Sequence, residues 1–123
     1  MAEIFDVVEL LSDVPEQGLN AGMQGTIVEC HASDAYEVEF VNESGETLAL
    51  LALMPEQFAV VWRARTRSWL PIPEQIAAVV ADLPAAAGYE VLDFARFLRA
   101  RQKRPYRDAL VENSVLAQSA QMV

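Results

Sequence analysis

The 123-residue sequence predicts an α+β protein in which a five-stranded SH3-like β-barrel is followed by two or three α-helices. Three observations support this prediction. The first sixty residues contain short apolar or alternating segments separated by turn-forming residues. Later segments carry apolar side chains at helical spacing. All nine basic residues follow Trp62, which divides the chain into an acidic first half and a basic remainder.

The acidic half is expected to form the barrel. Its predicted strands are residues 5–11, 25–30, 36–41, 47–54 and 59–65, with the fourth expected to be a buried returning strand. Tyr36, Val38 and Phe40 alternate with glutamates and therefore share one face. Residues 42–46 (NESGE) predict a hairpin turn with Gly45 in a left-handed conformation. A long early loop at residues 15–22 and a short helical turn at residues 55–58 complete an SH3-like arrangement.

A resemblance covers residues 4–62. The segments FDVVELL, GLNAGMQGTIVE, YEVEFVNESGETLALLAL and PEQF resemble a bacterial family of small SH3-like barrels of unassigned function. Members of that family often occur near toxin–antitoxin-type genes, which is an association and not a mechanism. The segment GMQGTIVE is also similar to KOW-type motifs of ribosome- and polymerase-associated barrels, and that likeness implies RNA binding.

Charge argues against nucleic-acid binding by residues 1–62. This part of the chain contains twelve carboxylates and no lysine or arginine. Affinity for a phosphate backbone comes largely from basic side chains that neutralise phosphates. We therefore expect protein partners rather than nucleic acid, and we divide the chain into an acidic barrel at 1–67 and a helical segment with a basic cluster at 72–123.

Between the two predicted domains, Arg63, Arg65 and Arg67 alternate along the chain. In an extended strand, all three would point to the same side. They would then form either a solvated strand edge or a docking strip for an acidic surface, including the protein's own barrel. Both interpretations remain open from the sequence.

The helical segment is expected to contain two or three helices. The first begins at Pro73, the second and strongest covers residues 89–102, and a third is predicted at residues 106–118. Along the second helix, a stripe of apolar residues recurs at helical spacing: Val91, Phe94, Ala95 and Leu98. Tyr89, Leu92 and Phe97 lie off that stripe, so either the rest of the chain covers them or a partner does.

Arginines accompany these apolar residues. Arg96, Arg99 and Arg101 have an ordinary explanation, because cations are favoured near the C-terminus of a helix and pair with neighbouring carboxylates such as Asp93. The alternative is a patch that binds phosphate, as in DNA, or attracts an acidic partner. The candidate partner-binding residues are Tyr89, Leu92, Phe97, Arg96, Arg99 and Arg101.

A second resemblance covers residues 72–104. The segment DLPAAAGYEVLDFARFLRARQ is similar to a small bacterial family described as antitoxin-like and VapB-related. The likeness implies oligomerisation or toxin binding, and it supplies no catalytic residues. The segment departs from the family at residues 85–88, which calls into question whether the helix continues across Gly88.

Nothing in the sequence predicts an enzyme. The single cysteine and the single histidine, Cys30 and His31, are adjacent in an expected strand and would point to opposite faces. We expect Cys30 to be a small core residue. There is no phosphate-binding loop or dinucleotide fingerprint, and we expect no cofactor and no metal. A single cysteine, no signal peptide and no apolar run of about 20 residues predict a cytoplasmic protein.

The sequence thus favours a non-enzymatic protein–protein interaction module, antitoxin-like or adaptor, whose partner is another protein or another copy. The alternative is a self-assembling oligomer in which the basic helices of one copy contact the acidic barrel of the next. A small hydrolase or metal enzyme is the third and least favoured hypothesis.

Overall fold

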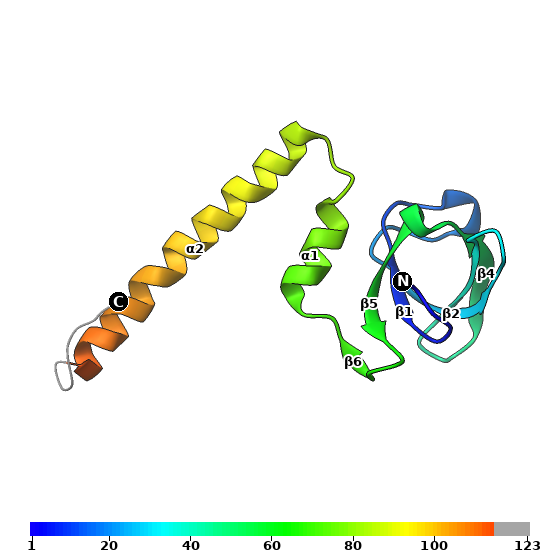
Figure 1. Ribbon diagram of the computed structural model, residues 1–123, viewed down its shortest axis with the longest axis horizontal. Helices are drawn as coiled ribbons and strands as arrows, with labels where there is room; N and C mark the ends of the chain where they lie inside the picture. The colour runs from blue at the N-terminus through cyan, green and yellow to red at the C-terminus, as the bar shows by residue number, and fades with distance from the viewer. Residues whose placement is uncertain (115–123) are drawn as a thin grey trace. The chain divides into compact units, whose positions relative to one another are not determined.

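The computed structural model describes the backbone of residues 1–114 and the side chains of residues 1–102 (Figure 1). The chain divides into two compact units, with the boundary between Ala81 and Asp82. The sequence placed the division between residues 67 and 72, and the first helix belongs to the compact unit that contains the sheet.

The first unit is one six-stranded antiparallel sheet with a short helix after it. The strands are β1 (Val7–Leu10), β2 (Gln24–Cys30), β3 (Tyr36–Val41), β4 (Thr47–Leu53), β5 (Phe58–Arg63) and β6 (Ser68–Trp69). Two short 3₁₀ turns, η1 (Pro15–Gln17) and η2 (Pro55–Gln57), precede β2 and β5. Helix α1 (Ile72–Val80) completes this unit, and α2 (Ala85–Ser114) forms the second. The strand order is β4-β3-β2-β1-β5-β6.

This arrangement confirms the α+β class and corrects the expected five-stranded closed barrel. The sheet is open, because β4 pairs only with β3, and β6 pairs only with β5. The additional strand arises because residues 63–67 do not continue one strand. The chain turns after Arg63, with Arg67 in a left-handed conformation (φ 53°), and Trp69 returns opposite Trp62.

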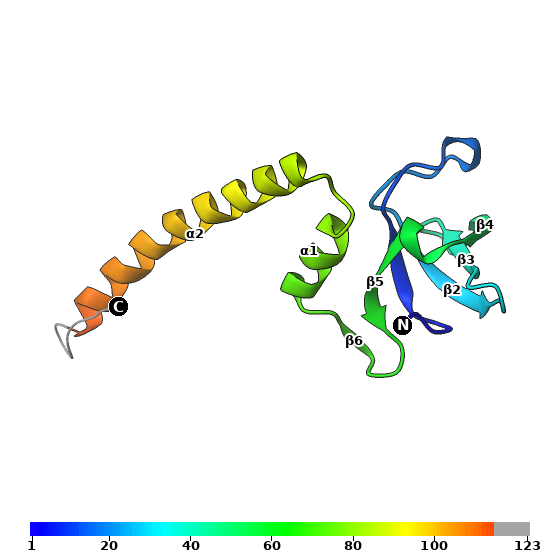
Figure 2. The same ribbon diagram turned by 45° about the horizontal axis from the view of Figure 1, so that its top comes forward.

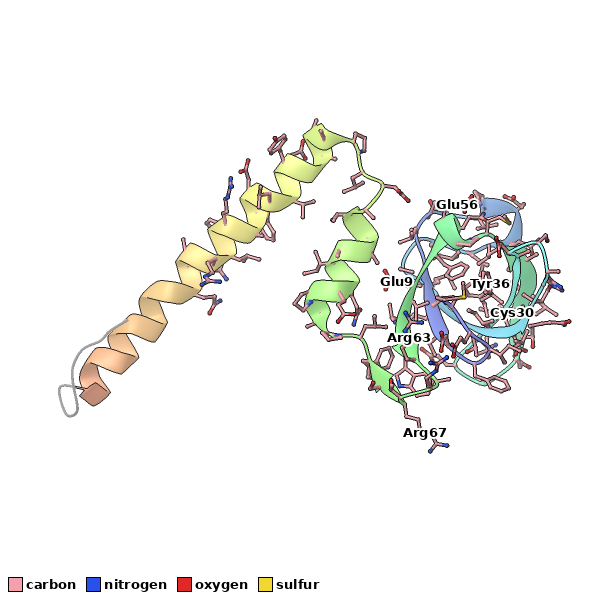
Figure 3. All side chains as sticks on the ribbon, viewed as in Figure 1. Glu9, Cys30, Tyr36, Glu56, Arg63 and Arg67 are labelled. Carbon is pink, nitrogen blue, oxygen red and sulfur yellow. The ribbon has the colours of Figure 1, made fainter. Side chains whose placement is uncertain are left out.

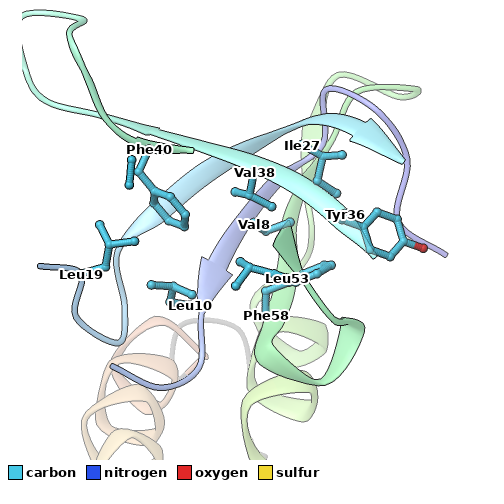
Figure 4. Packing of buried hydrophobic residues seen from close by; sticks show 10 residues of the cluster. Val8, Leu10, Leu19, Ile27, Tyr36, Val38, Phe40, Leu53 and Phe58 are labelled. Carbon is cyan, nitrogen blue, oxygen red and sulfur yellow. The ribbon is translucent and has the colours of Figure 1, made fainter. Parts of the chain in front are cut away.

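Alternating side chains of five strands and one loop meet on one side of the sheet and form the core (Figure 4). As predicted, Tyr36, Val38 and Phe40 are buried on a common face. The ring of Tyr36 meets that of Phe58 edge to face, with centroids 5.5 Å apart. Leu19, in the predicted early loop, is also fully buried, held by reciprocal backbone bonds between its own peptide groups and those of Val14.

Two predictions about burial were wrong. In β4, Ala49 and Leu53 are buried, but Leu48 and Leu50 are 49% and 56% exposed. The strand lies at the edge of the sheet, and only one of its faces contributes to the core. Cys30 is exposed rather than part of the core. A bulge between Ile27 and Glu29 places Cys30 opposite the buried Tyr36, but Cys30 is the last residue of β2, and the end of this strand is exposed. The predicted left-handed Gly45 (φ 85°) and the helical turn at η2 are both confirmed.

The buried carboxylate of Asp6 joins the N-terminal residues to the end of β5 and the turn that follows it. The side chain of Asp6 accepts hydrogen bonds from the backbone N–H groups of Glu3 and Ala64, each at 2.9 Å. Nη1 of Arg63 lies 3.4 Å from the same carboxylate and donates to the carbonyl of Met1 at 2.7 Å. Arg65 pairs with Glu3. Asp6 is completely buried, and the predicted strand at residues 5–11 begins only after it.

The alternating arginines therefore do not form a strip along one strand. Arg63 and Arg65 bind carboxylates of their own unit, so the interpretation as contacts with the protein's own acidic module is confirmed for these two. Arg67 lies at the end of the β5–β6 hairpin and points away from the sheet (Figure 3).

Helix α2 is longer than the sequence indicated. It continues across Gly88, whose N–H bonds to the carbonyl of Pro84 at 2.9 Å, and it reaches Ser114. The prediction of a separate third helix at residues 106–118 is therefore wrong for residues 106–114, which belong to α2. The last positions of the predicted helix, 115–118, lie outside the described residues.

We expect Asp6→Ala to lower the free energy of unfolding by about 2–4 kcal/mol, because it leaves two buried N–H groups and one arginine without their acceptor. Glu3→Ala is the matched control. It removes an exposed ion pair, keeps the backbone N–H that binds Asp6, and should cost less than about 1 kcal/mol. Urea unfolding measures both, and equal losses in the two variants would contradict the role of Asp6.

A second prediction concerns two glycines. A Cβ at Gly25 would lie 2.8 Å from Cγ1 of Val38 and 2.9 Å from the carbonyl oxygen of Glu39. Gly25→Ala should therefore lower the unfolding free energy by about 1–3 kcal/mol. A Cβ at Gly88 would meet nothing within 4 Å, so Gly88→Ala should stabilise α2 by up to about 1 kcal/mol. Thermal unfolding and circular dichroism at 222 nm test the two changes, and a stable Gly25→Ala variant would refute the close approach of β2 to β3.

Candidate functional site

The exposed apolar side chains of α2 are the first candidate site. Tyr89, Leu92 and Phe97 are 66%, 41% and 55% exposed, as expected for partner-binding residues. Val91 and Phe94, which belong to the regular apolar stripe of this helix, are exposed as well. Sequence reasoning did not name these two as partner-binding residues, because it chose the residues that lie off the stripe.

Helical geometry divides the six predicted residues between two faces of α2. At 100° per residue, Tyr89, Leu92, Arg96 and Arg99 fall on one face, and Phe97 and Arg101 lie about 140° around the axis. Phe94 accompanies the second group, and its ring stacks on that of Phe97 with centroids 6.2 Å apart. A helix with apolar side chains on so many sides is typical of one that is enclosed by other protein.

The arginines of α2 have two kinds of contact within the helix. Cζ of Arg101 lies 5.6 Å from the centroid of the Phe97 ring, a cation–π geometry. Nη1 of Arg96 lies 3.6 Å from the carboxylate of Asp93, which confirms the predicted pairing between neighbouring turns. Arg99 lines a shallow depression with Ala95, Arg96 and Ala100.

The predicted helix-end explanation of these arginines does not hold. Helix α2 continues from Arg101 to Ser114, more than three turns, whereas the favourable field of a helix terminus acts within the last turn. Arg96, Arg99 and Arg101 are therefore cations in the middle of a helix, next to exposed aromatic rings. The side chains of Lys103, Arg104 and Arg107 lie outside the described residues.

A hollow of about 490 Å³ in the first unit is the second candidate. Its lining residues come from the N-terminus, β5, α1 and the segment that precedes β3. Figure 2 shows α1 beside β5. Apolar side chains, among them Tyr36, Phe58 and Leu70, make most of the lining, and the charged groups there are Asp34, Arg63 and Glu74. Arg63 is already bound to Asp6. The lining contains no cysteine, serine or histidine.

Cys30 and His31 do not form a catalytic pair in the structure. The ring nitrogen Nε2 of His31 lies 3.0 Å from Oε1 of Glu37, while Cys30 is an exposed free thiol (Figure 3). The described residues contain no group of three or more histidine, cysteine or acidic side chains that could hold a metal ion. Among the helices of the described part, none is both long enough and apolar enough to cross a membrane.

Comparison with known proteins gives one match. Residues 4–60 match the model of a family described as Domain of unknown function (DUF4926). No curated protein and no solved structure matches the chain. The match begins just before β1 and ends within β5, so it covers five of the strands that hold the core and excludes β6, α1 and α2. Residues 4–60 are therefore similar to a family of unassigned function, which agrees with the coarser form of the sequence prediction.

Proposed function

We propose that this chain is a non-enzymatic interaction protein, antitoxin-like or adaptor, which binds another protein through α2. The observation that carries the proposal is the group of exposed aromatic residues Tyr89, Phe94 and Phe97 on a helix that also presents arginines. Tryptophan, tyrosine and arginine are the side chains most enriched at the energetic centres of protein interfaces, and phenylalanine is enriched in interface cores. Each aromatic side chain buries about 150–250 Å² when it is enclosed.

The partner's chemistry follows from the arginines. Arg99 and Arg96 flank Leu92 on one face of α2, and Arg101 covers Phe97 on another. An apolar groove bordered by carboxylates would take up the rings and pair with the guanidinium groups. Such complementary charges raise the rate of association more than they raise affinity. The VapB-related and SH3-like likenesses agree with this role, and we place the protein in the cytoplasm because its only thiol is exposed and has no cysteine partner within the chain.

Self-assembly through opposite charges remains the alternative. The first unit carries thirteen carboxylates against three arginines, a net charge of −10, and six of the nine basic residues follow it. Basic helices of one copy could therefore bind the acidic first unit of the next. Exposed charge pairs of this kind are screened over about 10 Å at 0.1 M salt, so such an assembly would weaken as salt is added.

The test is binding to the products of neighbouring genes in the source genome. Each product is co-expressed with the full chain, and the dissociation constant of any complex is measured by titration calorimetry. We expect Phe97→Ala and Tyr89→Ala to weaken binding by at least about ten-fold. Ile72→Ala, a 69% exposed residue of α1, is the matched control and should leave binding unchanged.

The same variants separate binding from folding. Because Tyr89 and Phe97 are exposed, their replacement by alanine should change the unfolding free energy by less than about 0.5 kcal/mol. If no neighbouring product binds, or if Ile72→Ala weakens binding as much as Phe97→Ala, then α2 is not the recognition element.

A further inference from the structure

The free edge of β4 lacks the features that normally protect a sheet edge. Its seven residues, TLALLAL, contain no charge, no proline and no glycine. By contrast, each of the four central strands, β1, β2, β3 and β5, contains at least one charged residue. Natural edges are usually short, charged or interrupted. The opposite edge follows that rule, because β6 has only two residues.

The outer side of β4 is open along its length. Residues 49–53 pair in regular register with residues 36–40 of β3, and the only irregularity lies at the start of the strand, beside Val41. No other backbone hydrogen bond found in the described part of the chain involves residues 47–53. Because alternate N–H and C=O groups of a strand point to opposite sides, one set of β4 has no strand to bind. Leu48 and Leu50 are exposed beside this open side.

We propose that a second copy of this chain binds here, with its own β4 antiparallel to the first, so that two sheets join into one. The sequence of β4 fits itself in such a pair. The core-lining faces of the two sheets are continuous only if the two-fold axis passes between the two copies of one residue, so that this residue lies opposite itself. The central residue of the uncharged strand is Leu50. Leu50 then lies opposite its counterpart, Leu48 opposite Ala52, and Ala49 opposite Leu51. Each large side chain beside the axis thus faces a small one.

Charge favours a second copy over a basic peptide as the occupant. The strand itself is neutral, so it offers no carboxylate to a basic partner strand, and the nearest acidic residues on its outer face are Glu37 and Glu39 of β3. Glu39 accepts a hydrogen bond from Thr47, and Glu37 binds His31. Across the dimer, the two copies of β3 are three strand spacings apart, about 14 Å. This exceeds the screening length of about 10 Å at 0.1 M salt.

The dependence on salt therefore distinguishes this dimer from assembly through opposite charges. Each copy carries a net charge of −9, so two copies repel at low ionic strength. We expect the dimer to become tighter between about 0.01 M and 0.2 M salt, where the screening length falls from about 30 Å to below 10 Å. An assembly that weakens over this range would contradict pairing through β4.

The first experiment measures the dimer with the full chain. Sedimentation equilibrium at 0.2 M salt compares the wild type with Leu50→Lys, which would place two cations opposite each other at the axis. We expect a concentration-dependent dimer in the wild type and a dissociation constant at least about ten-fold higher in Leu50→Lys. Val28→Lys adds the same charge to an exposed position on β2, a central strand, and should leave the dimer unchanged.

The second experiment tests the register and does not depend on the lysine variant. In a Cys30→Ser background, Leu50→Cys places a thiol of each copy at the axis, where directly opposed Cβ atoms lie about 4.5–5.5 Å apart. Mild oxidation should join the two chains by a disulfide, which needs a slightly shorter Cβ separation. Val28→Cys in the same background should remain monomeric on a denaturing gel. A wild type that is monomeric at about 100 μM would overturn the proposal. So would a dimer that is not weakened by Leu50→Lys and is not cross-linked through Leu50→Cys.

Discussion

The carboxylate of Asp6 holds together parts of the first unit that are far apart in the sequence. It binds the N–H of Glu3 before β1 and the N–H of Ala64 after β5, 58 residues later, and Arg63 closes over it from the end of β5. Arg63 donates a hydrogen bond to the carbonyl of Met1 and so fixes the position of Met1. The hairpin that leads to β6 and α1 begins at Ala64. The hollow beside α1, which both Met1 and Arg63 line, therefore depends on one buried acidic group.

Charge and apolar surface are distributed in a way that separates two kinds of contact. The first unit is strongly acidic, yet its open edge at β4 is neutral and apolar. The described part of α2 combines exposed aromatic rings with arginines. The two surfaces consequently suit different partners: a neutral strand for the edge, and an acidic surface with an apolar groove for the helix. Their opposite responses to salt follow from this difference.

The sequence correctly predicted those features of the fold that depend only on neighbouring residues. The alternation of Tyr36, Val38 and Phe40 and the left-handed turn at Gly45 are properties of neighbouring residues, and both were correct. The sequence could not place β4 at an edge, because strand order is set by pairings between distant segments. Alternation shows which residues share a face but not which face is covered, so the exposure of Leu50 was missed. The exposure of Cys30 was missed because alternation does not show where along a strand the core ends. For α2, the division of the six candidate residues between two faces already follows from the predicted helix at residues 89–102. The sequence did not indicate that the helix continues to Ser114, which removes the helix-end explanation of its arginines.

The position of β1 between β2 and β5 has a consequence for the order of folding. Ile27 and Val38 are partners across a short hairpin, whereas Val8 must find Val60 across more than fifty residues of chain. Closing the longer loop costs about 1 kcal/mol more in chain entropy. The meander β2-β3-β4 therefore forms at less entropic cost than the β1–β5 pairing, and pairings between distant segments slow the folding of a domain. On the ribosome, β1 leaves the exit tunnel first but must wait for β5 before Asp6 can be enclosed.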